Sequence, residues 1–267
     1  MADPFQDVDA AGPEFIRVFA DSMEVRQADP VMEAVVAAYL DRLGTVAPGE
    51  RLIEIGAGAG AVTRRIAARF PQAEVTGYEP SEGFVAEARA RTGSHANLAF
   101  TAANGADLPL EPASVDVAVM HTVLTHVTAP EALLAEAFRV LKPGGWLVAC
   151  DVDFSKAALA SFANDPLDAC ARAFVAEFVT DPFIVGKLRG LMRGAGFALT
   201  HFGVDSRVVV TPQQMLPWVE QTARLMEARG QIGTALADAL ITEHDRRAED
   251  GALYGYQAIG TAIARKP

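Results

Sequence analysis

The chain has 267 residues, of which 51% are hydrophobic and 21% charged, and its formal net charge is −11. This composition is typical of a globular protein, and the acidic excess disfavours nucleic acid and anionic membrane surfaces as partners. The two cysteines, Cys150 and Cys170, form no C-x-x-C pair, so neither a zinc site nor a disulfide framework is indicated.

The N-terminal residues lack the basic region and apolar core of a signal peptide. No apolar run reaches the length of a membrane span. We therefore expect a cytoplasmic protein whose partner is a small molecule, and a homodimer is compatible with the sequence.

Apolar residues recur at helical spacing through residues 13–43, with a break near Asp29-Pro30. Gly44 and Pro48-Gly49 end this segment. Residues 1–45 are therefore expected to form an N-terminal helical lid, ahead of a main domain over residues 46–267.

Strand and helix patterns alternate through the main domain. Strands are expected over residues 51–55, 74–78, 98–102, 115–120, 146–151, 197–210 and 254–264, and helices over residues 61–70, 82–92, 130–140 and 184–195. This alternation predicts an α/β fold, a doubly wound, mostly parallel seven-stranded Rossmann-like sheet with helices on both faces. Right-handed crossovers place the carboxyl ends of the parallel strands on one edge, where ligands bind.

Two stretches interrupt the alternation. Residues 154–180 and residues 211–248 are helical in spacing, and we expect them to be cap insertions that close over the ligand-binding edge. The first stretch and its surroundings are rich in phenylalanine: Phe154, Phe162, Phe174, Phe178 and Phe183. These rings indicate either an apolar substrate pocket or a core of the cap itself.

Residues 52–60 read Leu-Ile-Glu-Ile-Gly-Ala-Gly-Ala-Gly, a buried strand that runs into a glycine turn. Gly56, Gly58 and Ala61 also fit the dinucleotide pattern G-x-G-x-x-G/A, so the loop alone leaves open a nicotinamide or flavin dinucleotide and S-adenosylmethionine. Glu54 would repel a pyrophosphate at this position. Because a carboxylate attracts an ammonium and a sulfonium, Glu54 favours S-adenosylmethionine.

Four segments follow one another in a familiar order: Glu54-Ile-Gly-Ala-Gly-Ala-Gly60, Gly77-Tyr-Glu-Pro-Ser81, Asn104-Gly-Ala-Asp-Leu-Pro-Leu110 and Arg139-Val-Leu-Lys-Pro-Gly-Gly145. With these segments the chain resembles the class I S-adenosylmethionine-dependent methyltransferases, in particular the small-molecule, ubiquinone-biosynthesis-like type (methyltransferase type 11). The resemblance covers roughly residues 20–267, and the order of the segments carries it more than any one of them.

The resemblance implies a set of contacts to the methionine part of the cofactor. Gly56, Ala57 and Gly58 would let the backbone approach it, because glycine has no Cβ. Glu54 would attract its ammonium, directly or through water. His121 stands where members of the family often contact the same end.

The adenosine contacts are implied in the same way. Glu79 would accept hydrogen bonds from both ribose hydroxyls, and Ser81 is the better N-cap of the following helix, which leaves Glu79 free. Pro80 would pack on the adenine face, and Gly105 would donate its backbone N–H to a ring nitrogen. Asn104 stands where the family usually has Asp, and its carbonyl oxygen can still accept from the adenine amino group.

A general base is needed only if the acceptor is a hydroxyl that must lose its proton. His121, His126, Asp151 and Asp153 could serve, and the two aspartates are expected to face the acceptor pocket. His126 is expected to be structural, which leaves His121, Asp151 and Asp153 as the favoured candidates. No metal-ligand cluster stands out, so no metal is expected.

These features predict a metal-independent methyltransferase that acts on a small, fairly apolar molecule, with O-methylation favoured and a secondary-metabolite or quinone-like acceptor implied by the resemblance alone. One alternative is a non-methylating S-adenosylmethionine-binding protein on the same fold, such as a cyclase or a regulator. The other is an NAD(P)- or flavin-dependent oxidoreductase, against which the absence of a Tyr-x-x-x-Lys pattern counts.

Overall fold

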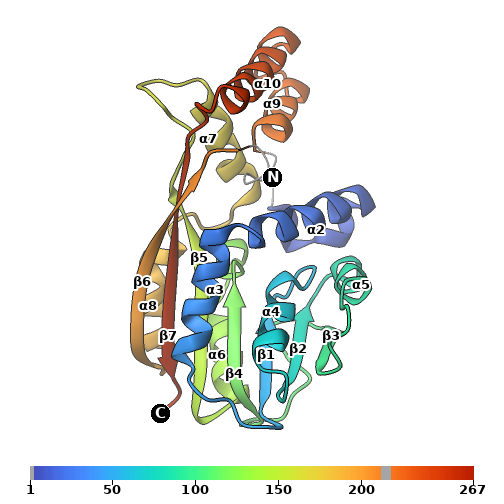
Figure 1. The fold of residues 1–267 in the computed structure, drawn as a ribbon, viewed down its shortest axis with the longest axis vertical. Helices are drawn as coiled ribbons and strands as arrows, with labels where there is room; N and C mark the ends of the chain where they lie inside the picture. The colour runs from blue at the N-terminus through green and yellow to red at the C-terminus, as the bar shows by residue number, and fades with distance from the viewer. Residues whose placement is uncertain (1–2, 212–217) are drawn as a thin grey trace.

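The computed structural model describes residues 3–211 and 218–267. Within them a seven-stranded sheet has the order β3-β2-β1-β4-β5-β7-β6. Its strands are β1 (Arg51–Ile55), β2 (Glu74–Glu79), β3 (Leu98–Ala102), β4 (Val115–His121), β5 (Leu141–Ala158), β6 (Ala198–Val209) and β7 (Gly255–Arg265). The strands from β3 to β5 pair in parallel, and β7 pairs antiparallel with both β5 and β6. The doubly wound, mostly parallel sheet predicted from the sequence is confirmed (Figure 1).

Helices cover both faces of this sheet. The helices are α1 (Val8–Ala11), α2 (Pro13–Gln27), α3 (Pro30–Arg42), α4 (Ala61–Arg69), α5 (Glu82–Ala90), α6 (Pro130–Val140), α7 (Leu167–Phe178), α8 (Ile184–Gly194), α9 (Trp218–Ala228) and α10 (Thr234–Glu249), with short 3₁₀ turns η1 (Pro4–Gln6) and η2 (Leu124–His126). Alternate residues of a strand point to opposite faces. Leu52 therefore packs in the core with α3 and α4, whereas Ile53 packs in the core with α6 and α8.

The region after residue 151 differs from its expected form. Residues 154–158 continue strand β5, because their pairing with β7 goes on past Asp153↔Ala258 to Ala158↔Tyr256, with a shift of register between the two pairs. The expectation of a helical insertion that starts at residue 154 is therefore wrong for its first part, and the helix α7 begins only at Leu167. In the second expected insertion, α9 and α10 are helical, and residues 212–217 lie outside the described residues.

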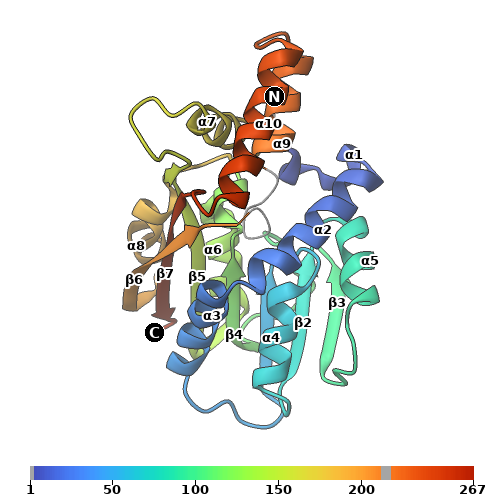
Figure 2. The same cartoon turned by 45° about the horizontal axis from the view of Figure 1, so that its top comes forward.

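The long strands β5, β6 and β7 rise beyond the parallel part of the sheet and carry α7, α9 and α10 at their upper ends (Figures 1 and 2). The helix α2 crosses above the carboxyl ends of the parallel strands, and α3 runs down one face of the sheet. The molecule thus has a lower layer, which holds the glycine turn, and an upper layer, which we call the cap and define as α7, α9 and α10.

A buried ion pair joins the N-terminal helices to the antiparallel strands. Asp29 is the N-cap of α3, where its Oδ1 accepts a hydrogen bond from Val31 N at 2.9 Å. Its Oδ2 accepts one from Arg207 of β6 at 3.1 Å, and both side chains are 2% exposed. Gln257 of β7 accepts a second bond from the same guanidinium at 2.7 Å. The predicted helix break near Asp29-Pro30 is thus held by a contact to β6, the edge strand of the antiparallel part of the sheet.

Candidate cofactor and acceptor site

The glycine turn after β1 follows from the backbone angles of its residues. Gly56, Gly58 and Gly60 have φ of +75°, +52° and +79°, a region that only glycine enters without strain. A Cβ on Gly56 would lie 2.6 Å from Cγ2 of Val123, so this position has no room for a larger residue. The N–H groups of Gly56 and Ala57 donate to the carbonyl of Tyr78 at 2.8 and 3.0 Å, which ties the turn to the end of β2.

Two buried carboxyl groups flank this turn. Glu54 is 2% exposed and accepts a hydrogen bond from the Thr63 hydroxyl. Glu79 is 7% exposed and accepts from Gly58 N at 2.9 Å and Ser81 N at 3.1 Å. Burial raises the pKa of Glu54 to about 8 and that of Glu79 to about 7. A bound cation would favour the ionised form of both groups.

Two adjoining cavities open around the turn, with about 710 and 650 Å³ of space between protein atoms, part of which is open to solvent. Both are lined by Gly56, Gly58, Met23 and Thr122. We call the cavity that contains Glu79 the adenosine cavity, after the part of the donor that the sequence resemblance would place there, and the one that contains Glu54 the transfer cavity.

The adenosine cavity brings together four residues that the sequence assigned to adenosine. Glu79, Pro80, Asn104 and Gly105 all line it, although they come from two different strand ends. Ser81 caps α5, where its Oγ accepts from Phe84 N at 3.0 Å, as expected. The Oδ1 of Asn104 accepts from Ala106 N at 2.9 Å, which orients the side chain.

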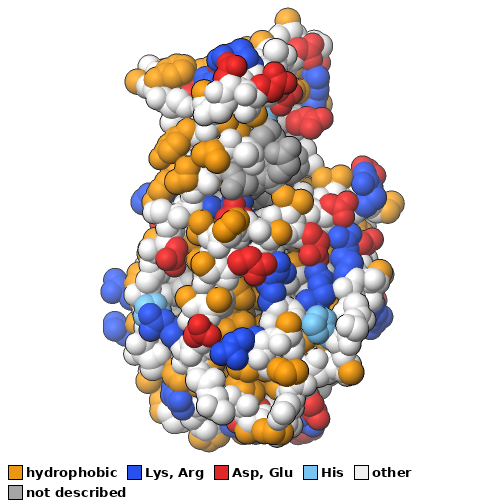
Figure 3. Space-filling view, in the orientation of Figure 1, with side chains coloured by type: hydrophobic (Ala, Val, Ile, Leu, Met, Phe, Trp, Pro, Cys, Tyr) orange, Lys and Arg blue, Asp and Glu red, His pale blue; other side chains and the backbone are white. Residues whose placement is uncertain are grey.

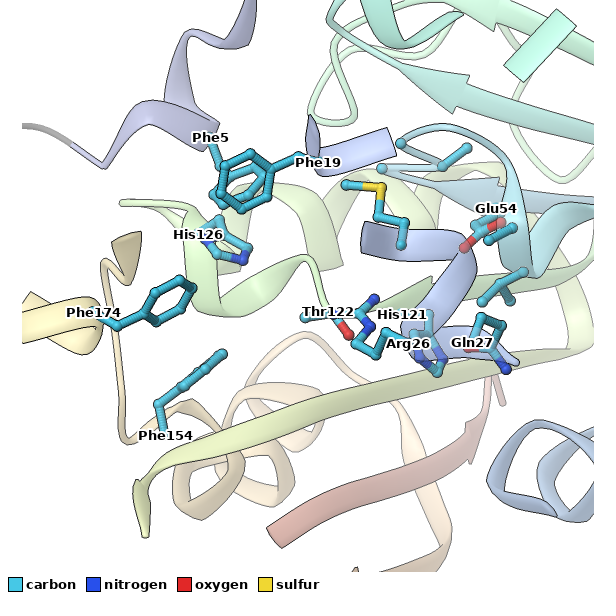
Figure 4. Close-up of a pocket in the computed structure, with 16 residues that line it drawn as sticks. Phe5, Phe19, Arg26, Gln27, Glu54, His121, Thr122, His126, Phe154 and Phe174 are labelled. Atoms are coloured by element: carbon cyan, nitrogen blue, oxygen red, sulfur yellow. The ribbon is translucent and has the colours of Figure 1, made fainter. Parts of the chain in front are cut away.

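The transfer cavity has a polar end and an aromatic end (Figure 4). Arg26, Gln27, Glu54 and His121 lie at the polar end. The Nε of Arg26, both amide atoms of Gln27 and the Nε2 of His121 are buried and have no hydrogen-bond partner within residues 3–211 and 218–267. Because buried polar atoms are nearly always paired, this cluster indicates that a polar ligand supplies the missing partners. The carboxylate and ammonium of a methionine moiety have the chemistry that this end can hold.

Four phenylalanines line the aromatic end: Phe5 of η1, Phe19 of α2, Phe154 of β5 and Phe174 of α7. The Phe154 ring centroid lies 6.5 Å from that of Phe174, which also stacks on Phe178 at 4.8 Å. Of the five phenylalanines singled out in the sequence, Phe162 and Phe183 are 57% and 58% exposed and line neither cavity.

Thr122 stands between the two ends with a strained backbone. Its φ is +57°, which is unusual for a β-branched residue, and its N–H donates to the carbonyl of Cys150 at 2.7 Å. Strained residues of this kind concentrate where ligands bind. Thr122 lines both cavities, so the strain lies at their junction.

The three candidate bases are not brought together. His121 lines the transfer cavity, its Nδ1 lies 3.3 Å from the Tyr39 hydroxyl, and burial lowers its pKa to about 3, so it stays neutral at pH 7. Asp151 and Asp153 line neither cavity, contrary to expectation. Because strand residues alternate, Phe154 points to the cavity and the two aspartates point to the other face of β5.

The two aspartates have local partners instead. Asp151 accepts from Thr125 N at 3.2 Å and Val152 N at 2.9 Å, and burial raises its pKa to about 6. Asp153 accepts from the Ser155 hydroxyl. This geometry gives no support to their assignment as groups that take a proton from an acceptor.

Several lining residues were missed in the sequence analysis. Arg26 and Gln27 end α2 just before the predicted helix break, and their polarity on an otherwise amphipathic helix is the signal that could have found them. Phe5 and Phe19 carry no such signal, because isolated phenylalanines in a helical pattern are usually core residues. His126, which was expected to be structural, lines both cavities.

No group of three or more His, Cys, Asp or Glu side chains is placed to hold a metal ion in the part of the chain that the structure describes. Across the same residues, no helix is both long and apolar enough to cross a membrane. On the face shown in Figure 3, acidic and basic side chains are interspersed over the lower layer.

Comparison with known proteins places this site in a family. The profile of a methyltransferase domain matches residues 53–149. A demethylmenaquinone methyltransferase of Tropheryma whipplei is 32% identical over 170 residues, which are 59% of this chain and 70% of the relative. The O-methyltransferase cnsE of Penicillium expansum is 33% identical over 201 residues, which are 73% of this chain and 66% of the relative.

A solved structure shares the fold. It is a crystal structure of a putative methyltransferase from Bacillus halodurans, with a TM-score of 0.61 and 17% identity over 88% of this chain and 99% of that one. The chain belongs to the class I S-adenosylmethionine-dependent methyltransferases, and S-adenosylmethionine is its methyl donor. The family gives no support to the oxidoreductase alternative.

Proposed function

We propose that the protein transfers the methyl group of S-adenosylmethionine to a hydroxyl oxygen of a small, flat, mostly apolar acceptor, such as a phenol or a quinol. One observation carries this proposal: the aromatic end of the transfer cavity is built from four phenylalanines of four separate elements. Three of them, Phe19, Phe154 and Phe174, are at most 5% exposed, so their rings enclose the space and do not face solvent.

The arrangement of the two ends supports transfer in this direction. The polar end of the cavity suits the amino acid part of the donor, and the glycine turn lets that part approach the backbone. An acceptor between the phenylalanine rings would then face the donor's methyl group from the side opposite the sulfur atom. Alignment of the two reactants and exclusion of water are the main tasks of the protein, because a sulfonium is already a good leaving group.

The names of two relatives bear on different parts of this proposal. The fungal relative is named an O-methyltransferase, which agrees with an oxygen acceptor. The bacterial one acts, by its name, on demethylmenaquinone, a flat and apolar quinone, and supports only the shape and polarity of the acceptor. A role in secondary metabolism is a proposal that rests on the family resemblance alone. The chain covers 60% of the length of a Streptomyces fradiae relative, 66% of the P. expansum one and 70% of the T. whipplei one, so the named activities are proposals for this chain.

Mass spectrometry of reactions with S-adenosylmethionine and a panel of phenols, naphthols, and amine and carboxylate analogues tests the proposal. We expect a gain of one methyl group on phenols or naphthols only. Phe154→Ala should raise the KM for the methylated phenol about 10-fold or more, as expected for a lost aromatic wall, while the Kd for S-adenosylmethionine stays unchanged.

Phe183→Ala is the matched control, since it removes a ring that is 58% exposed and outside both cavities. Its kinetic constants should equal those of the parent protein. Methylation of amines alone, or an unchanged KM in Phe154→Ala, would contradict the proposal.

A further inference from the structure

We propose that His126 is the general base of this transfer and that Asp3, a residue of the N-terminal segment, positions it. The inference rests on the proposed O-methylation, because only a hydroxyl acceptor needs a base. It assigns the base to the histidine that the sequence analysis expected to be structural. It also implies that His126 is oriented to act as a base only when residues 3–6 lie over the cavities.

The contact between the two residues is well defined. The Oδ2 of Asp3 lies 2.9 Å from Nδ1 of His126, and the Asp3 side chain is only 3% exposed. Oδ2 also accepts from the Thr180 hydroxyl at 3.0 Å, and Oδ1 accepts from Phe5 N at 2.9 Å. The carboxylate is thus held on both oxygens, and it fixes the plane of the imidazole.

This contact determines which ring nitrogen is basic. A carboxylate accepts hydrogen bonds, so the Nδ1 that faces Asp3 carries the proton and Nε2 keeps its lone pair. A ring nitrogen of His126 points into the transfer cavity, between the Phe5–Phe19 pair and Phe174 (Figure 4). The side chain is 16% exposed and lines both cavities, so an acceptor can reach it.

The surroundings of His126 suit the charge that it would gain. Its ring lies 4.5 Å from that of Phe5, and the Asp3 carboxylate, at the N-cap of η1, lies 2.9 Å from its Nδ1. A carboxylate in this position stabilises the positive charge of an imidazolium. His121 differs, since Arg26 and Arg65 add to the effect of its burial and disfavour its protonation.

In the proposed step the acceptor oxygen gains a methyl group and loses a proton. The acceptor oxygen forms a bond to the methyl carbon, and its proton passes to Nε2 of His126. The S–CH₃ bond breaks, and its electron pair neutralises the sulfonium to give S-adenosylhomocysteine. His126 then releases the proton to water when the products leave.

The N-terminal segment links this chemistry to closure of the site. Phe5 lines both cavities, and the Asp9 carboxylate of α1 accepts from Ser81 Oγ at 2.7 Å and from Glu82 N and Gly83 N at 2.9 and 3.0 Å. The segment is thus anchored at α5 on one side and at His126 on the other. Closure that covers the methyl donor therefore also delivers the residue that orients the base.

Nitrogen-15 NMR of the complex with S-adenosylhomocysteine tests the pairing without any acceptor. His126→Gln identifies the resonances of His126. We expect the Nδ1–H tautomer in the parent protein and its loss in Asp3→Asn, whose amide can donate to Nδ1. The Nε2–H tautomer in the parent protein would overturn the proposal.

Kinetics with two phenols of different acidity test the base itself. With phenol, His126→Gln should lower kcat by about 10²-fold or more, the usual range for loss of a general base. With 4-nitrophenol, which ionises near neutral pH without help, the loss should be much smaller. Equal losses with both phenols would mean that His126 only shapes the cavity and would overturn its role as base.

Gln6→Ala is the matched control for the lid. It removes the 2.7 Å bond from Gln6 Nε2 to the Thr180 hydroxyl and leaves Asp3 and His126 in contact, so it should not discriminate between the two phenols. If neither phenol is methylated while S-adenosylmethionine binds, the proposed O-methylation fails and the base role fails with it. If His126→Gln methylates phenol at the parent rate, the base role alone fails.

Discussion

The parallel and antiparallel parts of the sheet build their shares of the site in different ways. Around β1 and β2 the cofactor site consists of backbone groups and short side chains that lie within 26 residues of one another, from Glu54 to Glu79. Around β5, β6 and β7 the acceptor end combines residues as distant as Phe5 and Phe174. The comparison teaches that one local stretch can supply the glycine turn and both carboxyl groups of the donor site, whereas the aromatic walls of the acceptor end depend entirely on tertiary contacts.

The largest effect should come from the tertiary contacts of the antiparallel part. Arg207→Ala leaves the Asp29 carboxylate buried without its cationic partner, so the free energy of unfolding should fall by about 3–5 kcal/mol. Urea denaturation followed by circular dichroism measures this loss. Arg246→Ala, which breaks ion pairs of an arginine whose side chain is 55% exposed, should leave the free energy of unfolding almost unchanged. Similar losses in the two variants would show that the buried ion pair is no more important for stability than the exposed ones.

A smaller effect, confined to binding, is expected in the parallel part. Glu79→Ala should weaken S-adenosylmethionine binding by about 1.5–3 kcal/mol, the usual range for hydrogen bonds to a charged group. Isothermal titration calorimetry measures the change, and thermal unfolding of the variant checks that the glycine turn survives loss of the Gly58 N–H bond. Glu82→Ala, on the exposed first turn of α5, is the control. An unchanged Kd would remove Glu79 from the ribose contacts.

The smallest effect is a dependence of binding on pH. Because burial raises the pKa of Glu54 to about 8, the unliganded group is largely protonated at pH 7, and a bound ammonium favours its ionised form. S-adenosylmethionine should therefore release a fraction of a proton and bind more tightly as the pH rises from 6 to 8. Calorimetry in buffers of different ionisation enthalpy detects this proton release. The release should be absent in Glu54→Gln.

The same carboxyl groups affect the stability of the unliganded chain in the opposite direction. The folded states of Glu54 and Glu79 keep their protons to higher pH than the unfolded chain does. Their contribution to stability is therefore present below about pH 4.5 and is lost as the pH rises through 7 to 8. A melting temperature that rises over this interval in the parent protein, relative to Glu54→Gln, would contradict the raised pKa.

The comparison between the parallel and antiparallel parts of the sheet also explains which site residues could be predicted from the sequence. The glycine turn, Glu79 and Asn104 were predictable, because each lies at the end of a strand whose pattern is clear and whose order is set by the parallel crossovers. Asp151 and Asp153 were placed on the wrong face because β5 was expected to end at residue 151. Once the strand is known to continue to Ala158, alternation alone assigns Phe154 to the cavity.

The contact between Asp3 and His126 lay beyond any such reasoning. The two residues are 123 positions apart, and neither stands in a pattern that pairs them. Arg26 and Gln27 were hidden for a related reason, since only the packing of α2 over the strand ends brings their polar atoms to the cavity. Periodicity in the sequence indicates single helices and strands, whereas the positions of these residues depend on how helices and strands pack against one another.

The ion pair between Asp29 and Arg207 has a consequence for the design of hybrid enzymes. Asp29 begins α3 only two residues after Gln27, so strand β6 fixes the end of α2 that carries the polar side of the transfer cavity. A cap exchanged between relatives to alter acceptor choice would therefore keep its donor site only if β6 and the turn between α2 and α3 were transplanted together. The part that must be exchanged as one unit therefore combines strand β6 with the turn between α2 and α3, although the two come from opposite ends of the chain.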